Sequence, residues 1–462
     1  MTMTARTRRT TALAGGLGVA VLLAGCGADE VESGGSTGGS AQEAEAAQDF
    51  DCSPYEEFGE LDGETVSVYT SIVDPEDAAH IESYAPFEEC TGVEVQYEGS
   101  QEFEAQLVVR VQSGNAPDIA FIPQPGLLAT LVGTGAVVPA PDATEANVDE
   151  HWDESWKTYG TVDGEFYAAP LGANAKSFVW YSPSAFEEAG YEVPQTWEEM
   201  IALSDEIAAT GAKPWCAGIA SGDATGWPAT DWLEDVVLRT AGPEVYDQWV
   251  NHEIPFNDPQ VLEALNTAGE ILKNPAYVNG GLGEVQSIAT TEFGDAGLPI
   301  LEGSCWMHRQ ASFYQANWPE GTEVAEDGDV FAFPLPPIGS EGAAPVLGGG
   351  EFTAAFDDRP AVQAFQTYLS SDEWANIKAQ VSPAGWTSSN TGLDPENLTS
   401  PIDQLAAELF QDPEAVFRFD GSDLMPGAVG AGALWDELTN WIATDKASEA
   451  VLQDVENAWP AS

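Results

Sequence analysis

Positive charge is scarce in this sequence. The 462 residues contain 14 lysines and arginines against 77 aspartates and glutamates, which gives a formal net charge of −63 at pH 7. A nucleic-acid-binding protein needs a basic surface that releases counterions from phosphates, and a protein held on anionic lipid needs basic residues at the bilayer. The sequence excludes both classes, so no nucleic acid is expected as a partner. We interpret the acidity as a surface adapted to salt or to an extracellular setting.

Sequence motifs of catalysis and metal binding are also missing. There is no Gly-Lys dipeptide of a phosphate-binding loop, no His-Glu-x-x-His and no Cys-x-x-Cys, and the four histidines are scattered. One Gly-x-Ser-x-Gly match at 34–38 has no strand before it and no helix after it, so it does not fit a nucleophile elbow. The sequence therefore predicts no metal and no cofactor.

No apolar run beyond the N-terminus approaches the ~18 residues of a membrane-spanning helix. The N-terminus itself has three arginines, a short apolar run at 11–23 and then Leu23-Ala-Gly-Cys26, which is typical of an export signal. The last four residues also resemble a bacterial lipoprotein box; the alternative is an ordinary secretory signal with an unrelated cysteine. We expect residues 1–25 to be removed and Cys26 to carry lipid. The mature charge is then 11 − 77 = −66.

Residues 26–50 are rich in Gly, Ser, Ala and Glu and have no periodic pattern, so they are expected to form a flexible tether. From residue 63 on, strand and helix patterns alternate, which favours parallel strand pairing and an α/β fold. The expected strands cover 65–70, 93–97 and 118–122. The expected helices cover 74–90, with Asp74 as N-cap, then 103–112, a helix that begins at 196, 360–370 and 446–459.

Several sequence motifs occur in a characteristic order along the chain. They are Asn115-Ala-Pro-Asp-Ile-Ala-Phe121, Phe166-Tyr-Ala-Ala-Pro170, Val179-Trp-Tyr-Ser-Pro-Ser184 with Gly190 and Pro194-Gln-Thr-Trp197, Gly348-Gly-Gly350, and the stretch from Met425-Pro426 to Trp435. Together with the lipoprotein box, this order resembles the extracellular solute-binding proteins of sugar ABC transporters. The sequences of residues 226–232 and 305–310 are most similar to those of the α-glucoside-binding branch of this family.

The resemblance implies a two-lobe α/β fold of the type II periplasmic binding proteins, with a ligand cleft between lobes that are joined by hinge crossovers. By correspondence, lobe 1 covers 60–170 plus 345–388, and lobe 2 covers 175–340 plus 392–462. Ligands of such folds bind at the C-terminal ends of parallel strands and at domain interfaces.

An exported protein with an even number of cysteines is expected to form disulfides. Cys52, Cys90, Cys216 and Cys305 remain once Cys26 is set aside, and four cysteines allow three pairings. We favour Cys52–Cys90 and Cys216–Cys305, because each pair then joins elements within one lobe.

A sugar ring offers an apolar face to tryptophan and a rim of hydroxyls to planar polar side chains. The residues that the resemblance and the strand ends place at the cleft are Thr70, Ser71, Gln124, Asn174, Lys176, Trp227, Asp231, His308, Arg309, Gln310, Gly349, Gly350, Trp386 and Trp435. The structural alternatives are a helix cap for Thr70 and Ser71, a turn for Gln124, a solvated surface role for Lys176, core packing for Trp227 and Trp435, an ion pair for Arg309 and a hinge turn for Gly349 and Gly350. Gln124–Pro125 and Asn174–Ala175 replace acidic residues that are familiar in maltose-binding clefts.

The resemblance implies a monomeric receptor, not an enzyme, that sits on the extracellular face of the bacterial cell membrane through a lipid anchor alone. It would capture a sugar, an α-glucoside or a related di- or oligosaccharide, and deliver it to the permease subunits of an ABC transporter. A secreted carbohydrate-active hydrolase and an adhesion or receptor ectodomain with the same fold are the alternatives.

Overall fold

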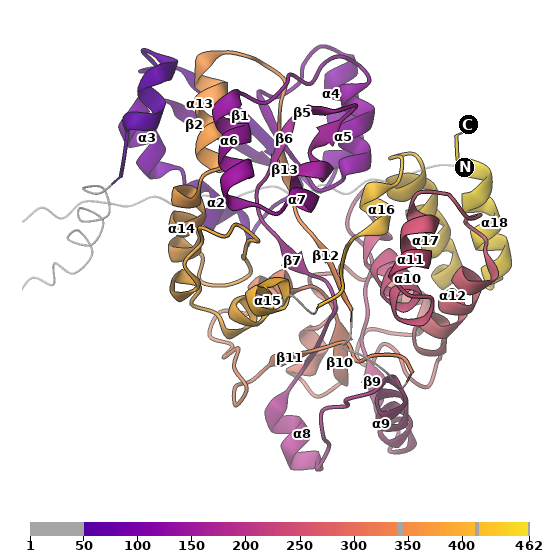
Figure 1. Ribbon diagram of the computed structural model, residues 1–462. Helices are drawn as coiled ribbons and strands as arrows, with labels where there is room; N and C mark the ends of the chain where they lie inside the picture. The colour runs from indigo at the N-terminus through magenta and orange to yellow at the C-terminus, as the bar shows by residue number, and fades with distance from the viewer. Residues whose placement is uncertain (1–49, 340–344, 412–414, 461–462) are drawn as a thin grey trace, which may run out of the picture. The chain divides into compact units, whose positions relative to one another are not determined.

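The computed structural model describes residues 50–339, 345–411 and 415–460 (Figure 1). The predicted signal peptide, the lipidation residue Cys26 and the tether up to residue 49 lie outside the described residues. The unit described below begins at Phe50. It contains two larger sheets, each covered by helices, and a small sheet of three crossing strands.

The first larger sheet has the strand order β2-β1-β3-β13-β6. Its strands are β1 (Thr65–Thr70), β2 (Glu94–Gly99), β3 (Ile119–Ile122), β6 (Ala168–Pro170) and β13 (Phe352–Ala355). β1 is parallel to β2 and β3, whereas β13 returns from far along the chain and pairs antiparallel with β3 and β6. Ile119 and Phe121 point into one core cluster and Ala120 and Ile122 into another, so β3 is buried on both faces.

Short helices cover this sheet and form the first lobe. They are η1 (Ser53–Phe58), α2 (Asp77–Glu82), α3 (Ala85–Thr91), α4 (Phe103–Gln112), α5 (Pro125–Val132), α6 (Asp142–His151), α7 (Glu154–Tyr159), α13 (Pro360–Leu369) and α14 (Asp372–Val381), with a small hairpin of β4 (Thr161–Val162) and β5 (Glu165–Phe166).

The single helix predicted over 74–90 is wrong. The segment forms α2 and α3, because Pro86 lacks the N–H that a continuous helix needs and instead occupies the first turn of α3. Asp74 is not a cap either: the residue before α2 is Glu76, whose side chain makes no capping hydrogen bond.

The second larger sheet has the order β11-β8-β10-β9 and forms the second lobe with its helices. Its strands are β8 (Phe178–Tyr181), β9 (Lys213–Trp215), β10 (Cys305–Arg309) and β11 (Phe331–Pro334). Phe178 and Trp180 point into one core cluster, Val179 and Tyr181 into another, so this sheet is also buried on both faces. The surrounding helices are α8 (Pro183–Ala189), α9 (Trp197–Ala209), α10 (Trp227–Thr240), α11 (Pro243–Val250), α12 (Pro259–Leu272), η2 (Val285–Thr290), η3 (Leu298–Ile300), η4 (Ser312–Asn317), η6 (Val429–Leu434), α17 (Trp435–Ala443) and α18 (Ser448–Ala458).

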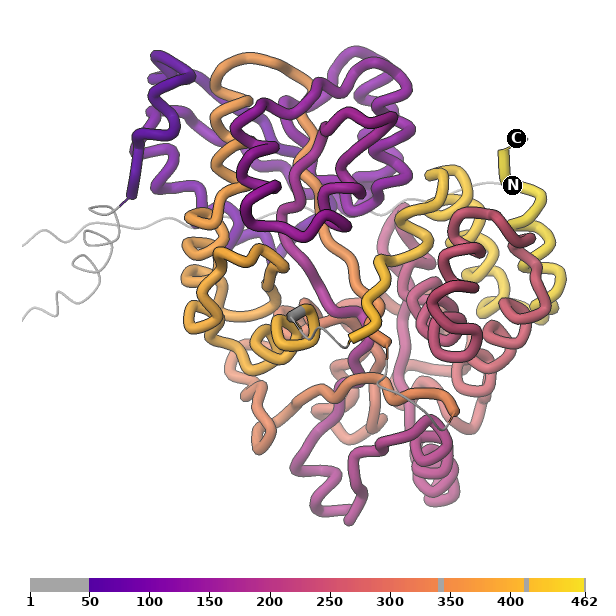
Figure 2. Tube along the Cα trace, in the orientation of Figure 1, coloured from indigo at the N-terminus to yellow at the C-terminus, as the bar shows by residue number. Residues whose placement is uncertain are grey.

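Three short strands cross between the lobes side by side: β7 (Asn174–Ala175), β12 (Val346–Gly349) and β14 (Phe417–Phe419). β12 lies in the middle, parallel to β14 and antiparallel to β7. Figures 1 and 2 show β7 and β12 running next to each other toward the first sheet. η5 (Pro395–Asn397), α15 (Pro401–Gln411) and α16 (Gly421–Leu424) lie before and after β14. α15 contributes Ala407 to a core cluster of the first lobe and Ile402 to one of the second.

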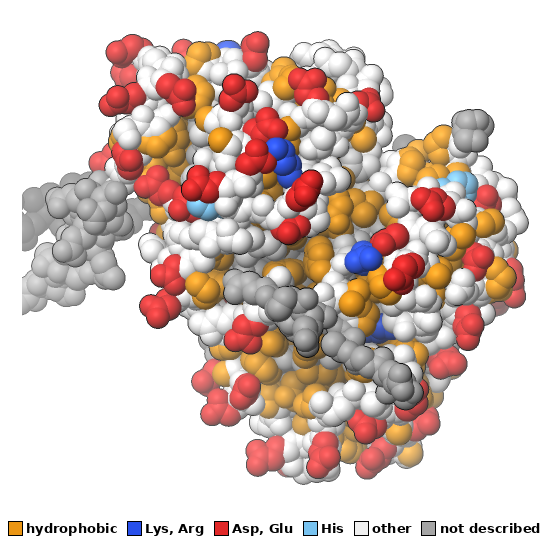
Figure 3. Space-filling view, in the orientation of Figure 1, with side chains coloured by type: hydrophobic (Ala, Val, Ile, Leu, Met, Phe, Trp, Pro, Cys, Tyr) orange, Lys and Arg blue, Asp and Glu red, His pale blue; other side chains and the backbone are white. Residues whose placement is uncertain are grey.

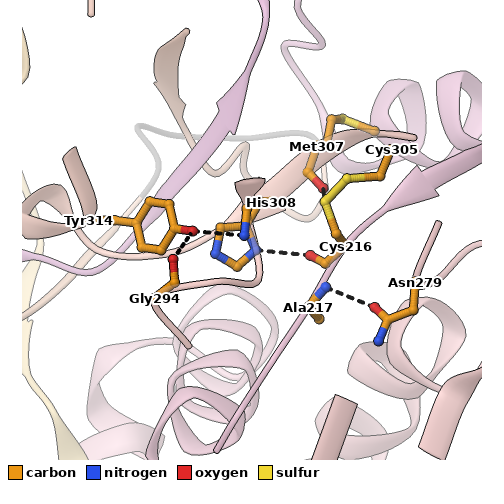
Figure 4. Close-up of a disulfide and its surroundings, with 9 residues drawn as sticks. Cys216, Ala217, Asn279, Gly294, Cys305, Met307, His308 and Tyr314 are labelled. Atoms are coloured by element: carbon orange, nitrogen blue, oxygen red, sulfur yellow. Dashed lines mark hydrogen bonds between the residues drawn. A yellow bond between two sulfur atoms is a disulfide. The ribbon is translucent and has the colours of Figure 1, made fainter. Parts of the chain in front are cut away.

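Both disulfides join the predicted partners. Cys52 is bonded to Cys90 and Cys216 to Cys305, with Cα atoms 5.8 Å apart in each pair. In Figure 4 the carbonyl oxygen of Cys216 is hydrogen-bonded to Nδ1 of His308, at 2.9 Å. The bridge therefore fixes the start of the loop that leads from β9 to α10.

Acidic side chains are spread over the visible face of the molecule, with few basic ones among them (Figure 3). Eight of the eleven lysines and arginines of the described chain have a carboxylate within 4 Å. Lys213, Lys273 and Lys378 are the exceptions within residues 50–460, gaps aside. Most lysine and arginine side chains of the described chain are thus engaged in local ion pairs.

Candidate ligand-binding site

A cavity opens between the two lobes, and residues from both lobes and from the crossing strands line it. The first lobe contributes the residues that follow β1, β3 and β12, which include Ser71, Gln124 and Glu351. The second lobe contributes residues from the loop before α10, from α10 itself and from the start of α17. The lining comprises Ser71, Ile72, Val73, Glu76, Gln101, Glu104, Pro123, Gln124, Asn174, Lys176, Ser221, Ala224, Trp227, Phe293, Phe313, Gly350, Glu351, Asp423 and Trp435.

Aromatic rings form the wall on the side of the second lobe. Trp227 packs edge to face against Phe293, with ring centroids 5.2 Å apart, and lies 6.0 Å from the ring of Phe313. Trp435 is only 3% exposed, yet it belongs to none of the hydrophobic core clusters. These rings offer apolar faces to the cavity, as a site for a sugar ring requires.

Buried polar atoms without hydrogen-bond partners gather at the same cavity. They are Glu104 Oε2, Gln124 Oε1, Asn174 Oδ1 and Trp435 Nε1. Gln124 is 4% exposed and donates through Nε2 to Glu104, at 3.1 Å, so its free oxygen is held in place. Buried polar groups are nearly always hydrogen-bonded. Several unpaired atoms around one cavity indicate a site for a ligand rich in donors and acceptors.

Lys176 lies at the floor of the cavity, directly after β7. Its Nζ lies 3.2 Å from Asp231 and 3.9 Å from Asp423, is hydrogen-bonded to Asp420, and is 5.4 Å from the centre of the Trp227 ring. Burial by itself lowers the pKa of Lys176, but the three carboxylates outweigh burial and hold the pKa well above its usual range. Lys176 therefore stays charged, and it joins the crossing segments β7 and β14 to α10.

An ion-pair network continues from Lys176 into the second lobe. Arg309 contacts Asp231 at 3.2 Å and Asp235 at 2.5 Å, and Arg239 also contacts Asp235, at 2.5 Å. All of these groups are buried. Buried charges are costly unless they are paired. Arg309 pairs with Asp231, and Asp231 pairs with Lys176, so both residues hold Lys176 in position.

The lobes also touch at the rim of the cavity. The backbone of Gly126 on α5 lies so close to the carbonyl group of Met425 that a Cβ would overlap it. Asp223 donates its N–H to the carbonyl oxygen of Gln101, at 3.3 Å. The described arrangement is therefore one in which the two walls meet.

A second cavity adjoins the first and shares Ile72, Glu76, Asn174, Phe313 and Glu351 with it. The remaining residues of this second cavity are Pro75, Ala79, His80, Ala173, Ala316, Lys378, Pro383, Ala384, Gly385 and Trp386. The two cavities therefore lie side by side, with part of their lining in common.

Comparison with known proteins assigns the chain to a family. The sequence profile of the bacterial extracellular solute-binding proteins matches residues 66–376. The chain belongs to this family.

Two relatives match nearly the whole of this solute-binding protein. It is 41% identical over 405 residues to the osmoprotective compounds-binding protein GgtB of Synechocystis sp., a match that covers 87% of this chain and 94% of the relative. It is 39% identical over 429 residues to the alpha-glucosides-binding periplasmic protein AglE of Rhizobium meliloti, covering 89% and 91%. The resemblance stated from the sequence motifs is confirmed.

Solved structures confirm the two-lobe α/β fold. The bacterial solute receptor AcbH, described as selective for b-D-galactopyranose, superposes with a TM-score of 0.72 at 20% identity, over 85% of this chain and 98% of that one. Maltose-bound MalE3 of T. maritima gives a TM-score of 0.65 at 16% identity, over 86% and 98%. At this identity the match concerns the fold alone.

The structure brings many of the predicted site residues to the first cavity. These are Ser71, Gln124, Asn174, Lys176, Trp227, Gly350 and Trp435, while Trp386 lines the second cavity. A Cβ on Gly350 would meet the carbonyl oxygen of Gly172 at 2.2 Å, so the glycine serves close backbone packing.

The other predicted residues lie behind the wall. Thr70 Oγ1 accepts a hydrogen bond from the N–H of Ile72, and Gln310 Oε1 accepts one from the N–H of Ala311. Burial lowers the pKa of His308 to about 4, so its ring is neutral and supports the loop at Cys216. Asp231, Arg309 and Gly349 also line neither cavity.

Sequence reasoning missed the acidic part of the lining: Glu76, Glu104, Glu351 and Asp423. With 77 acids in the chain, no sequence pattern distinguishes these four; only the position of Glu351, directly after Gly350, offered a signal. Burial raises the pKa of Glu76 to about 8 and raises that of Glu104 and Glu351 as well. Near neutral pH the carboxyl group of Glu76 can therefore donate as well as accept a hydrogen bond.

Within the described residues, no group of three or more His, Cys, Asp or Glu side chains is arranged to hold a metal ion. None of the helices described there is both long and apolar enough to cross a membrane.

Proposed function

We propose that the protein is a lipid-anchored, monomeric receptor on the extracellular face of the bacterial cell membrane. It captures a sugar, an α-glucoside or a related di- or oligosaccharide, and delivers it to the permease subunits of an ABC importer. The observation that carries the proposal is the first cavity, where aromatic faces and unpartnered buried polar atoms surround one space between two lobes. The relative named as alpha-glucosides-binding supports the choice of sugar.

The lining residues divide into two roles in this proposal. Trp227 and Trp435 cover the apolar face of a sugar ring. Ser71, Gln124 and Asn174 bind hydroxyls at its rim, and Lys176 donates to an oxygen while Asp231 and Asp420 keep it in place. Trp386 contacts a further part of the ligand in the second cavity. Thr70, His308, Arg309, Gln310, Gly349 and Gly350 act by supporting the wall.

We propose the lobe boundaries expected from the sequence, 60–170 plus 345–388 for lobe 1 and 175–340 plus 392–462 for lobe 2, with one change at the start of the last segment. The lobes close over the sugar by a hinge at β7, β12 and β14, and the closed form is what the permease recognises. Leu393 and Leu398 pack in a core cluster of the first lobe, which supports moving the start of the last lobe-2 segment beyond them.

The ligand leaves unchanged, because the protein binds without catalysis. A turnover assay on α-glucosides distinguishes this proposal from a secreted hydrolase: product release would overturn it. Uptake of labelled sugar after deletion of the chain distinguishes it from an adhesion protein, since an adhesion protein would leave import unchanged.

A thermal-shift panel of sugars tests the proposal directly. A ligand at 100 times its dissociation constant stabilises the folded protein by about 2.7 kcal/mol, which is a measurable rise in melting temperature. A panel of α-glucosides, other disaccharides and polyols in which no compound raises the melting temperature would reject a sugar ligand.

The anchor has its own test. The Cys26→Ser variant should be found in the medium and not in the membrane fraction, because one lipidated cysteine is the proposed attachment. A variant that stays with the membrane would show that the anchor assignment is wrong.

A further inference from the structure

Acidic side chains outnumber basic ones in the wall of the first cavity. Among the described residues that line it, Lys176 is the one basic residue. Its Nζ is hydrogen-bonded to Asp420 and lies 3.2 Å from Asp231, and neither of these two residues lines the cavity. The charge of Lys176 is therefore balanced behind the wall. The acidic residues of the lining itself are Glu76, Glu104, Glu351 and Asp423.

Glu104 on α4 and Asp423 on α16 are the two of these acids that most lack a positive partner. Within the described part of the chain, Glu104 has no basic side chain within 4 Å, and Asp423 has only the engaged Nζ of Lys176, at 3.9 Å. Burial and, to a lesser degree, Asp223 raise the pKa of Glu104. Burial and neighbouring carboxylates, Asp420 foremost, raise the pKa of Asp423 well above its usual range. The protonated forms are thus favoured unless a positive charge comes between the two groups.

The unpartnered atoms of the lining are mainly hydrogen-bond acceptors. Among the described residues, Glu104 Oε2, Gln124 Oε1 and Asn174 Oδ1 have no partner, against a single donor, Trp435 Nε1. Gln124 is 4% exposed, and its Nε2 donates to Glu104 Oε1 at 3.1 Å, so the free amide oxygen is held near the Glu104 carboxyl group. A ligand that satisfies these atoms brings more donors than acceptors, and an ammonium group has three N–H donors and no acceptor.

The aromatic wall also suits a positive charge. The faces of aromatic rings attract cations, tryptophan most strongly. The ring of Trp227 already lies 5.4 Å from the Nζ of Lys176, whereas no such contact involves Trp435 in the described residues. No three His, Cys, Asp or Glu side chains of the described segments are arranged to hold a metal ion. The lining therefore favours an organic ammonium group.

We propose that the first cavity takes a sugar that bears a protonated amine, with its ammonium group between Glu104 and Asp423 and beside Gln124 Oε1. This inference rests on the proposed function, in which a sugar ring lies against Trp227 and Trp435, and it names the preferred class of that sugar. When the ammonium group binds, the two carboxyl groups ionise and their protons pass to the solvent. An uncharged sugar causes no such release, so proton release distinguishes the two classes of ligand.

Calorimetric titrations near neutral pH test the proposal. The ligands are methyl α-glucoside and maltose, the derivatives of each in which one hydroxyl in turn is replaced by an amine, and the uncharged N-acetyl form of every amine. The proteins are the wild type, Glu104→Gln, Asp423→Asn and, as a matched control, Glu102→Gln. Glu102 is exposed, directly precedes α4 and lines neither cavity, so its replacement removes the same charge outside the site.

We expect at least one amine derivative to bind the wild type about 10- to 100-fold more tightly than its parent sugar and its N-acetyl form, because charge-assisted hydrogen bonds are stronger than neutral ones. Glu104→Gln and Asp423→Asn should each weaken binding of this amine about 10-fold more than binding of the parent sugar, whereas Glu102→Gln should match the wild type. Titrations in buffers with different heats of ionisation should show proton release for the amine, and less of it in Glu104→Gln.

A wild type that binds a parent sugar but no amine derivative more tightly would overturn this inference and leave the proposed function intact. An advantage of the amine that persists in both Glu104→Gln and Asp423→Asn would also overturn it, because another part of the wall would then hold the charge. Both replacements keep the size of the side chain, and either one suffices if the other does not fold. A wild type that binds none of these sugars, charged or uncharged, would reject the α-glucoside proposal and this inference with it.

Discussion

Trp435 is the proposed site residue whose surroundings the structure defines most clearly. It lines the first cavity, its Nε1 has no partner, and it stands outside the core clusters, whereas Trp441 on the same helix is part of a core. We expect Trp435→Ala to weaken sugar binding by a few kcal/mol through lost contact area. Trp441→Ala should instead lower the free energy of unfolding by about 3–5 kcal/mol. Calorimetry and denaturant unfolding of both variants check this; a Trp435→Ala protein that binds normally and unfolds early would contradict it.

Lys378 also makes a pH-dependent contribution to stability. Burial lowers its pKa from 10.5 to about 7, so between these values the unfolded chain binds a proton that the folded protein does not. The free energy of unfolding therefore rises with pH across this range. We expect the wild type to gain stability relative to Lys378→Met between pH 7 and 9.5, measured by urea unfolding at each pH. A constant difference between the two proteins would contradict the buried-lysine assignment.

At the scale of elements, the positions of strands and helices were easier to predict than a break within a helical segment. β1 and β3 have strong apolar patterns because both faces of the first sheet are buried, and their predicted positions agree with the structure to within a residue. The prediction of one continuous helix over 74–90 was wrong because a single proline, Pro86, divides the segment into two helices. The acidic lining of the cavity could not be predicted, because which of many carboxyls meet depends on how loops from two lobes come together.

The disulfides should differ in what their loss does to binding. Cys216–Cys305 closes a loop with a separation of 89 residues and fixes the segment that leads to Ser221 in the first cavity, whereas Cys52–Cys90 spans 38 residues and borders no cavity. Replacing either pair by serine should cost about 3–5 kcal/mol of stability. Only loss of Cys216–Cys305 should also weaken sugar binding, which titration of both double variants would show. Equal affinity in the two would contradict a role of the loop in the site.

For the whole molecule, the excess of acidic residues has a direct consequence for stability. Most basic side chains of the described chain are already paired, so the remaining carboxylates repel one another without local compensation. We expect the melting temperature to rise between about 0.05 and 1 M sodium chloride, because salt shortens the range of this repulsion. Affinity for an uncharged sugar should stay within about twofold over the same range. A melting temperature that falls with salt would contradict this account.

Three crossing strands set how the sugar can leave. A single connection between lobes would permit swivelling as well as bending, but β7, β12 and β14 are hydrogen-bonded side by side, and a ladder of three resists twisting. In the proposed hinge motion, opening is then a rotation about one axis, and the contact between Gly126 and Met425 limits how far the lobes close. The receptor should therefore switch between two states, open and closed. The residence time of the sugar should then equal the lifetime of the closed state.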